Sequence, residues 1–333
     1  MKRTKKRFLA ALLLLCFSAL LLPLCGCRQV KAEHKDDGKP FIVATIFPPY
    51  DFAREIGADL IDARMLIRPG TDAHSYDPTP SDIRAIENCD IFIYTGGESE
   101  AWAKELLDSI GNSGHSSPQV ISMLETVKPL EEETPSGAES QKHSHMHDED
   151  AEAPEYDEHV WTSPKNAIAV AKAIKEALAK ADPAHAADYA NACSRYQSQL
   201  SRLDSAYRTV VQNSRLKTVL FADRFPFRYL TEEYGLQAAA AFPGCSSESE
   251  PSVKTMAFLI DTVRAENIPY VFTVERSNRS IADTVAAETG AGVLEMHSCH
   301  TLSAAELARG ESYLSLMYKN LENLKRGLRY AAD

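Results

Sequence analysis

Residues 41–57 read FIVATIFPPYDFAREIG, and this stretch decides the fold class. Its first six residues are apolar or β-branched, which is typical of a buried strand. Pro48 and Pro49 then turn the chain into a helical pattern that runs from Tyr50 to Gly57. A strand followed at once by a helix is the unit from which parallel α/β sheets are built.

The same alternation continues along both halves of the chain. Further strands are expected at 63–67, 91–97 and 119–123, and again at 218–223, 236–242, 269–275 and 291–299. Helices are expected at 82–88 with Ser81 as the N-cap, 98–110, 164–180, about thirty positions from Pro183, 227–235, 247–268, 277–290 and 312–332. We therefore predict an α/β fold of two similar lobes with parallel sheets, joined by one long backbone helix. The site is expected in the cleft between the lobes.

The domain organisation follows from these elements. An N-terminal α/β lobe is expected at 41–181, a linking helix at 182–214 and a C-terminal α/β lobe at 215–331. Residues 128–158 lack apolar periodicity and are rich in Glu, Pro, Ser and His, which predicts a long mobile loop within the first lobe. Roughly 300 residues outside the N-terminal segment also favour two domains over one.

The N-terminus is typical of an export signal. Five Lys and Arg residues precede an apolar run that is too short to be a confident membrane span. The run ends at Leu24-Cys25-Gly26-Cys27, which resembles the lipobox of bacterial lipoproteins. We predict a signal peptide at 1–26, lipidation of Cys27 and a polar tether at 27–40, so that the protein is anchored to the membrane outside the cytoplasm. An ordinary secretory signal or an uncleaved anchor is the alternative.

Charge and cysteine content limit the partners. The formal net charge is −11, and it becomes −16 once the five signal-peptide cations are removed. Because phosphate binding requires a basic face, nucleic acid is not an expected partner. An exported protein can oxidise its thiols, and Cys245 and Cys299 both follow predicted strands of the same half. A Cys245–Cys299 disulfide is therefore a hypothesis, although sequence does not give connectivity.

Residues 143–161, HSHMHDEDAEAPEYDEHVW, indicate a metal. His143, His145 and His147 alternate and are followed by acids. Neutral imidazole suits Zn²⁺, and nearby carboxylates raise the local concentration of divalent cations. We predict an auxiliary metal loop at these three histidines. The alternative is a solvated charge run with incidental histidines.

Three other histidines stand at strand ends or in loops. His74 lies in DAHSYDPTPSD, His159 in DEHVWTSP and His297 in MHSCH. No local motif such as HExxH joins them, and each alone is more often a surface or capping residue than a ligand.

The arrangement of the whole chain adds to these patterns. The order lipobox, DAHSYDPTPSD, His/Asp-rich loop, DEHVWTSP, long helix, RYLTEEYGL, SESEPS, ETGAGVLEMHS resembles the zinc/manganese-binding lipoproteins of metal ABC importers. The His-rich insertion is similar to that of the zinc-uptake branch of these solute-binding proteins. The resemblance implies rigid lobes and high-affinity capture of Zn²⁺, with Mn²⁺ possible. It also implies delivery to the transmembrane permease subunit of an ABC importer by a monomer.

The resemblance also implies a ligand set. His74 and His159 match the first two histidine ligands, and His297 falls where relatives place an Asp ligand. The third ligand, His or Glu in relatives, falls within FADRFPFRY, where this chain has Asp223 and Arg224. A guanidinium has no free acceptor and cannot bind a cation. Asp223 is therefore the candidate, with a salt bridge or a helix cap as its alternative role.

The roles of two further residues and three alternative functions stay open. Glu275 matches a common family Glu near the cleft and is expected in the second shell, and His300 is an alternative ligand. A set of imidazoles with one carboxylate or water favours zinc over manganese. The alternatives are a Mn²⁺-specific binding protein, a surface adhesin, or a zinc hydrolase, which the absence of an HExxH motif disfavours.

Overall fold

A computed structural model describes residues 38–71, 76–112, 117–138, 155–244 and 250–331. The predicted signal peptide, most of the tether and Cys27 lie outside these ranges. In the part of the chain that is described, no helix is both long and apolar enough to cross a membrane.

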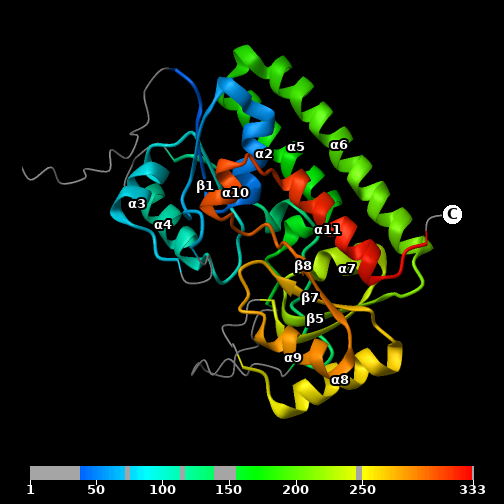
Figure 1. Ribbon diagram of the computed structural model, residues 1–333. Coiled ribbons are helices and arrows are strands. Elements are labelled where there is room, and N and C mark those ends of the chain that lie inside the picture. The colour runs from blue at the N-terminus through cyan, green and yellow to red at the C-terminus, as the bar shows by residue number, and fades with distance from the viewer. Residues whose placement is uncertain (1–37, 72–75, 113–116, 139–154, 245–249, 332–333) are drawn as a thin grey trace, which may run out of the picture. The chain divides into compact units, whose positions relative to one another are not determined.

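The first half of the chain forms a parallel four-stranded sheet (Figure 1). Its strands, in the spatial order β2-β1-β3-β4, are β1 Phe41–Ala44, β2 Asp62–Met65, β3 Ile91–Tyr94 and β4 Gln119–Ser122. The helices between them are α2 Phe47–Gly57, α3 Pro80–Glu87 and α4 Ala101–Asn112. β1 is buried at all four residues, as its apolar sequence predicts.

The second half repeats this topology. Its strands, in the order β6-β5-β7-β8, are β5 Thr218–Phe225, β6 Gln237–Pro243, β7 Tyr270–Val274 and β8 Gly292–Met296. The helices between them are α7 Arg228–Tyr234, α8 Val253–Glu266 and α9 Ser280–Thr289. In both sheets the first strand lies between the second and the third. The carboxyl ends of parallel strands therefore form one ligand-binding edge in each lobe.

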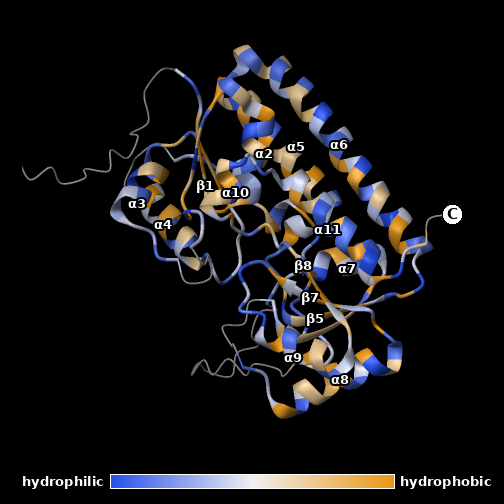
Figure 2. Ribbon diagram, viewed as in Figure 1, coloured by the Kyte–Doolittle hydropathy of each residue, from blue (hydrophilic) through white to orange (hydrophobic). Residues whose placement is uncertain are grey.

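One long helix connects the two sheets. After α5 Pro164–Ala181 the chain forms α6 Ala186–Asn213, whose buried residues recur at helical spacing. Hydrophilic and hydrophobic residues alternate along α6 in Figure 2, which is the pattern of a helix with one packed face. The last long helix, α11 Tyr313–Gly327, packs against α6 and α2. The predicted fold class, an α/β fold of two similar lobes joined by a long helix, is confirmed.

Several local details differ from the sequence-based expectations. The N-cap of α3 is Thr79, not Ser81, because Thr79 and Asp82 form a reciprocal capping box. The structure also contains short elements that the sequence did not predict. They are the 3₁₀ turns Ala58–Leu60, Leu124–Thr126, Val160–Thr162 and Pro183–His185 and the helix α10 Ala304–Ala308. Such turns lack enough periodicity to be visible in a sequence.

The segment expected to be a mobile loop, 128–158, is anchored at both described ends. Glu131 and Tyr156 form an antiparallel bridge, and Ser136 forms a parallel bridge with Ala239 of β6. The hydroxyl of Thr255 on α8 also donates to the Gly137 carbonyl oxygen. The chain therefore crosses from the first lobe to the edge of the second sheet before it enters residues 139–154, which lie outside the described ranges.

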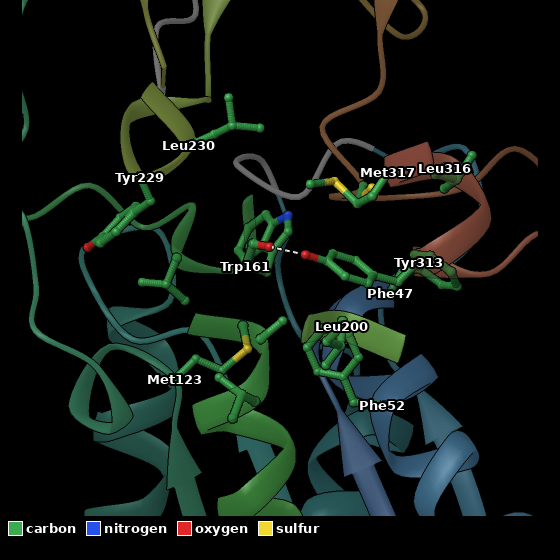
Figure 3. Close-up of a cluster of buried hydrophobic side chains, with 14 of the residues drawn as sticks. Phe47, Phe52, Met123, Trp161, Leu200, Tyr229, Leu230, Tyr313, Leu316 and Met317 are labelled. Atoms are coloured by element: carbon green, nitrogen blue, oxygen red, sulfur yellow. Dashed lines mark hydrogen bonds between the residues drawn. The ribbon is translucent and has the colours of Figure 1, made fainter. Parts of the chain in front are cut away.

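Trp161 connects the two lobes. Its side chain is fully buried, and its indole N–H donates to the carbonyl oxygen of Ser298 at 2.7 Å. The hydroxyl of Tyr313 on α11 donates to the Trp161 carbonyl oxygen at 2.6 Å, the dashed line in Figure 3. Met123 and Met317 pack in the same hydrophobic cluster, which contains residues of both sheets. The first lobe and the segment after β8 therefore share one core.

Replacing Tyr313 by Phe tests this connection. The substitution leaves the buried Trp161 carbonyl oxygen without its donor, which costs about 1–3 kcal/mol. We expect the free energy of unfolding in urea to fall by that amount. Tyr318 lies on the same helix and is 39% exposed, so Tyr318→Phe is the matched control and should stay within about 0.5 kcal/mol of the parent. Equal losses for both variants would contradict the assignment.

Candidate metal site

His159 is held by the loop that enters the turn Val160–Thr162. Its backbone N–H donates to Oδ1 of Asp157 at 2.8 Å, and its ring Nδ1 lies 3.2 Å from the same oxygen. The Thr162 hydroxyl donates to the His159 carbonyl oxygen. The imidazole is 1% exposed. Because a carboxylate faces Nδ1, the proton belongs on that nitrogen, and Nε2 is the acceptor nitrogen of the neutral ring.

His300 lies close to His159 although 140 residues separate them in sequence. The two ring centroids are 5.6 Å apart in an edge-to-face arrangement, and the His300 ring lies 5.0 Å from that of Trp161. The backbone N–H groups of Phe47 and Gly70, both in the first lobe, donate to the carbonyl oxygens of His300 and Leu302. The segment after β8 is therefore seated on the first lobe, where it presents His300 beside His159.

A cavity of about 270 Å³ lies at these two rings. Its polar lining comes from both halves of the chain and includes His159, Arg224, Glu275, Arg276 and His300. Gly244, at the end of β6, also lines it. A Cβ atom on Gly244 would come within 3.2 Å of Cε1 of His159, so the glycine lets the imidazole approach the second sheet.

His297 does not line this cavity. Its Nδ1 accepts a hydrogen bond from the backbone N–H of Cys299 at 2.9 Å. Its Nε2 is buried without a hydrogen bond and lies 3.6 Å from Oε1 of Glu306. The Asn320 side chain accepts a hydrogen bond from the backbone N–H of His297 and donates one to the His297 carbonyl oxygen. At the end of β8, His300, the predicted alternative ligand, therefore lines the cavity, whereas His297 does not.

Asp223 and Glu275 are engaged with neighbouring backbone groups. Oδ1 of Asp223 accepts a hydrogen bond from the backbone N–H of Arg224, and Oδ2 accepts one from the backbone N–H of Val274 at 3.1 Å. Asp223 therefore fastens the irregular end of β5 to β7. Glu275 lines the cavity, and its two oxygens accept from the N–H and the hydroxyl of Ser298. The prediction that Glu275 lies in the second shell of a metal site stays a prediction.

The remaining predicted site residues fall in two groups. His74, His143, His145, His147 and Cys245 lie outside the described residues. Cys299 is described as a buried free thiol. The predicted Cys245–Cys299 bridge involves a residue outside the described ranges and stays a prediction. Within the described ranges, no group of three or more His, Cys, Asp or Glu side chains is arranged to hold a metal ion. His159 and His300 are the pair that the fold brings together.

Carboxylates surround His159 and change its protonation. Burial alone lowers the pKa of His159, but the carboxylates of Asp157, Glu158 and Glu132 outweigh it and raise the pKa above 6.5. Burial also raises the pKa of the Glu158 carboxyl. The site therefore stabilises positive charge on the side of the first lobe, which suits a cation as well as a proton.

Sequence reasoning missed the structural roles of four residues that shape the site. Trp161 and Asp157 stand in the DEHVWTSP motif, yet their contacts with Ser298 and with the His159 ring depend on the folded chain. Gly244 carried no signal beyond a turn after Pro243. Arg224 was noted as unable to bind a cation, whereas its position in the cavity wall was not predicted.

Two α/β lobes joined by a long helix, with a cavity lined from both, define a binding protein for a small ligand. Residues 42–327 match the family described as ZnuA, zinc-uptake complex component A, periplasmic. The high-affinity zinc uptake system protein ZnuA of Bacillus subtilis is 31% identical over 94% of this chain and 95% of its own length. The chain belongs to this zinc-uptake component A family, and the predicted resemblance is confirmed.

Two further similarities concern a longer relative. The zinc-binding lipoprotein AdcA of Streptococcus pneumoniae is 29% identical over 93% of this chain, which spans about 60% of the AdcA length. The crystal structure of the Zn(II)-bound ZnuA-like domain of that AdcA matches with a TM-score of 0.70 at 27% identity, over 87% of this chain and 99% of the domain. The family is one of solute-binding components and not of enzymes, so the hydrolase alternative is not supported.

The titration of His159 tests the electrostatics of the site. Because the neighbouring carboxylates raise its pKa, the ring should gain its proton at a higher pH than a free imidazole does as the pH is lowered. Asp157→Asn removes the carboxylate at 3.2 Å and should move this midpoint to lower pH. The measurement is NMR of the imidazole protons between about pH 8 and about pH 5. Asp188→Asn, on the exposed face of α6, is the control and should leave the midpoint in place.

Proposed function

We propose that the protein is the extracytoplasmic component of an ABC importer, which captures Zn²⁺ in the cavity between the lobes and delivers it to the permease. The observation that carries the proposal is the approach of His159 and His300 in one cavity, with Asp157 on Nδ1 of His159. A carboxylate that orients a histidine is the usual outer partner of a zinc ligand. Zinc is the ion in the names of two relatives, the zinc-binding lipoprotein AdcA and the high-affinity zinc uptake system protein ZnuA.

The proposed ligands are His159, His300 and His74. His159 and His300 offer nitrogen donors at the cavity, and His74 comes from the loop that matches the family's first histidine ligand. His297 and Asp223 are weaker candidates, because neither lines the cavity, and backbone N–H groups donate to Nδ1 of His297 and to both oxygens of Asp223. Three imidazoles leave one open position for the four-coordinate geometry that Zn²⁺ prefers. Such a nitrogen-rich set favours Zn²⁺ over Mn²⁺.

Release is proposed to follow from the split of the ligands between the lobes. His159 precedes α5 in the first lobe and His300 follows β8 in the second. A displacement on docking to the permease that breaks the contacts of the segment after β8 with the first lobe, such as the bond from the Phe47 N–H to the His300 carbonyl oxygen, would separate the donors and weaken the site. The histidines at 143, 145 and 147 are proposed to gather ions and pass them inward. Shortly before these histidines, the chain is bridged at Ser136 to Ala239 of the edge strand β6.

A zinc titration against a competing chelator tests the ligand assignment. The protein without residues 1–27 should bind one Zn²⁺ tightly. His159→Ala and His300→Ala should each weaken binding by more than about 100-fold, since each removes a direct donor. His297→Gln is the matched control, and it should change the affinity by less than about threefold while thermal unfolding confirms that it folds.

Two results would contradict these assignments. Loss of tight binding in His297→Gln with retention in His300→Ala would reverse the roles of the two histidines. Weak binding that disappears only when residues 139–154 are deleted would mean that the auxiliary loop is the binding site, and the transport proposal would fail.

Membrane anchoring through Cys27 is the second part of the proposal. The sequence Leu24-Cys25-Gly26-Cys27 supports it, and two or more acyl chains are enough for stable attachment. We expect cells that express the full chain to incorporate labelled fatty acid into the protein and to keep it in the membrane fraction. Cys27→Ser should abolish the label and release the protein, while Cys193→Ser, a buried thiol of α6, should retain both. Equal labelling of the two variants would contradict the anchor.

A further inference from the structure

Tyr229, the second residue of α7, binds backbone groups of the first lobe. Its hydroxyl accepts a hydrogen bond from the N–H of Leu130 at 3.1 Å and donates one to the carbonyl oxygen of Asp157 at 2.9 Å. Tyr229 is 3% exposed and packs in the hydrophobic cluster that contains Trp161 (Figure 3). Burial raises the pKa of Tyr229 to about 12, so the hydroxyl keeps its proton and stays a donor to Asp157.

The Tyr229 hydroxyl takes the place of one hydrogen bond between two antiparallel segments. Glu131 and Tyr156 form an antiparallel bridge, and the N–H of Asp157 donates to the Leu130 carbonyl oxygen at 2.9 Å. In a regular ladder, Leu130 and Asp157 would exchange both of their N–H···O bonds. Here the hydroxyl accepts from the Leu130 N–H and donates to the Asp157 carbonyl oxygen. Without it, these two groups lose their partner, or the segments close on each other and Asp157 moves.

Asp157 connects this ladder to the candidate metal site. Its Oδ1 accepts a hydrogen bond from the N–H of His159 at 2.8 Å and lies 3.2 Å from the ring Nδ1. A carboxylate in this position fixes the direction of a ligating imidazole and raises its basicity. The backbone of Asp157 is therefore held by Leu130 and Tyr229, while its carboxylate orients the His159 ring.

The segment that contains Leu130 also contacts the second lobe at several other points. Residues 130–137 reach three elements of that lobe, through the ion pair of Glu133 with Arg228 of α7 at 2.9 Å, the hydrogen bond from the Ala240 N–H of β6 to the Ser136 carbonyl oxygen at 3.0 Å, and that from the Thr255 hydroxyl of α8 to the Gly137 carbonyl oxygen at 2.9 Å. The helix α7 also packs against the turn Val160–Thr162. A shift of α7 relative to the first lobe would therefore act on both sides of His159.

These contacts give Tyr229 a role in the site. We propose that Tyr229 positions His159 for metal binding by holding the backbone of Asp157, so that zinc affinity depends on the contact between α7 and the first lobe. Tyr229 acts through Asp157 and is a positioning residue, not a ligand. The inference rests on the proposed function, because it requires His159 to be a zinc ligand.

The test is a double-mutant cycle of zinc affinity, measured on the full chain in mild detergent against a competing chelator. Tyr229→Phe removes only the hydroxyl and keeps the ring in the hydrophobic cluster. It should weaken zinc binding by about tenfold, and Asp157→Ala by about 10–100-fold, since outer partners of a ligating histidine contribute that much. Because Tyr229 acts through the Asp157 carboxylate, adding Tyr229→Phe to Asp157→Ala should change the affinity by less than about twofold.

Tyr207→Phe is the matched control. The Tyr207 hydroxyl is also buried and donates to a backbone carbonyl oxygen, that of Met317 on α11, at 2.8 Å. Tyr207→Phe should lower the temperature of thermal unfolding about as much as Tyr229→Phe does, and it should leave the zinc affinity within about threefold of the parent.

Proton exchange at His159 gives a second readout that needs no zinc. The Nδ1 proton of His159 is followed by NMR in the apo protein and identified by its loss in His159→Gln. It should exchange with water at least about tenfold faster in Tyr229→Phe than in the parent, because the carboxylate that protects it is no longer held in place. In Tyr207→Phe the exchange should match the parent.

The outcomes separate this inference from the proposed function. Equal losses of zinc affinity in Tyr207→Phe and Tyr229→Phe would mean that general loosening of the core weakens the site, and the inference would fail. Losses that add fully in the double variant would show that Tyr229 does not act through Asp157, and unchanged proton exchange in Tyr229→Phe would overturn the inference as well. Absence of tight zinc binding in the parent would instead overturn the proposed function, and the exchange measurement would still decide whether Tyr229 positions the ring.

Discussion

The site depends on one buried connection between the lobes, the side chain and carbonyl group of Trp161. The indole N–H binds the Ser298 carbonyl oxygen, and the Trp161 carbonyl oxygen accepts from Tyr313. These hydrogen bonds lie inside a hydrophobic cluster that contains residues of both sheets, so breaking them would expose unsatisfied polar groups to an apolar interior. Because Trp161 follows His159 by two residues and contacts the His300 ring, these Trp161 contacts also set the distance between the two imidazoles.

Charge is distributed unevenly around the cavity. On the side of the first lobe, Asp157 and Glu158 stabilise positive charge at His159 and raise its pKa. On the side of the second lobe, Arg224 and Arg276 line the wall. A cation near His159 is therefore favoured by the carboxylates of the first lobe and opposed by the charge of the arginines in the second.

The strands and long helices could be predicted because each carries its own periodicity. β1 is continuously apolar, as a strand buried on both faces requires, and α6 repeats its buried residues at helical spacing. The N-cap at Thr79 was placed two residues late, since Thr79 and Ser81 are both good caps and only the reciprocal bond with Asp82 selects one. The anchoring of Ser136 on β6 was not predictable, because an edge strand recruits backbone and not a particular side chain.

For this protein the sequence by itself determined the fold class and the family, since periodicity and the motif around Trp161 are local properties of the chain. The surroundings of His297 and His300 were left to the tertiary structure. Both follow β8 within five residues, but the N–H of Cys299 occupies Nδ1 of His297, while the His300 ring reaches His159 and the cavity. The direction of a side chain at a strand end is set by the groups that satisfy its hydrogen bonds, and those groups come from distant parts of the chain.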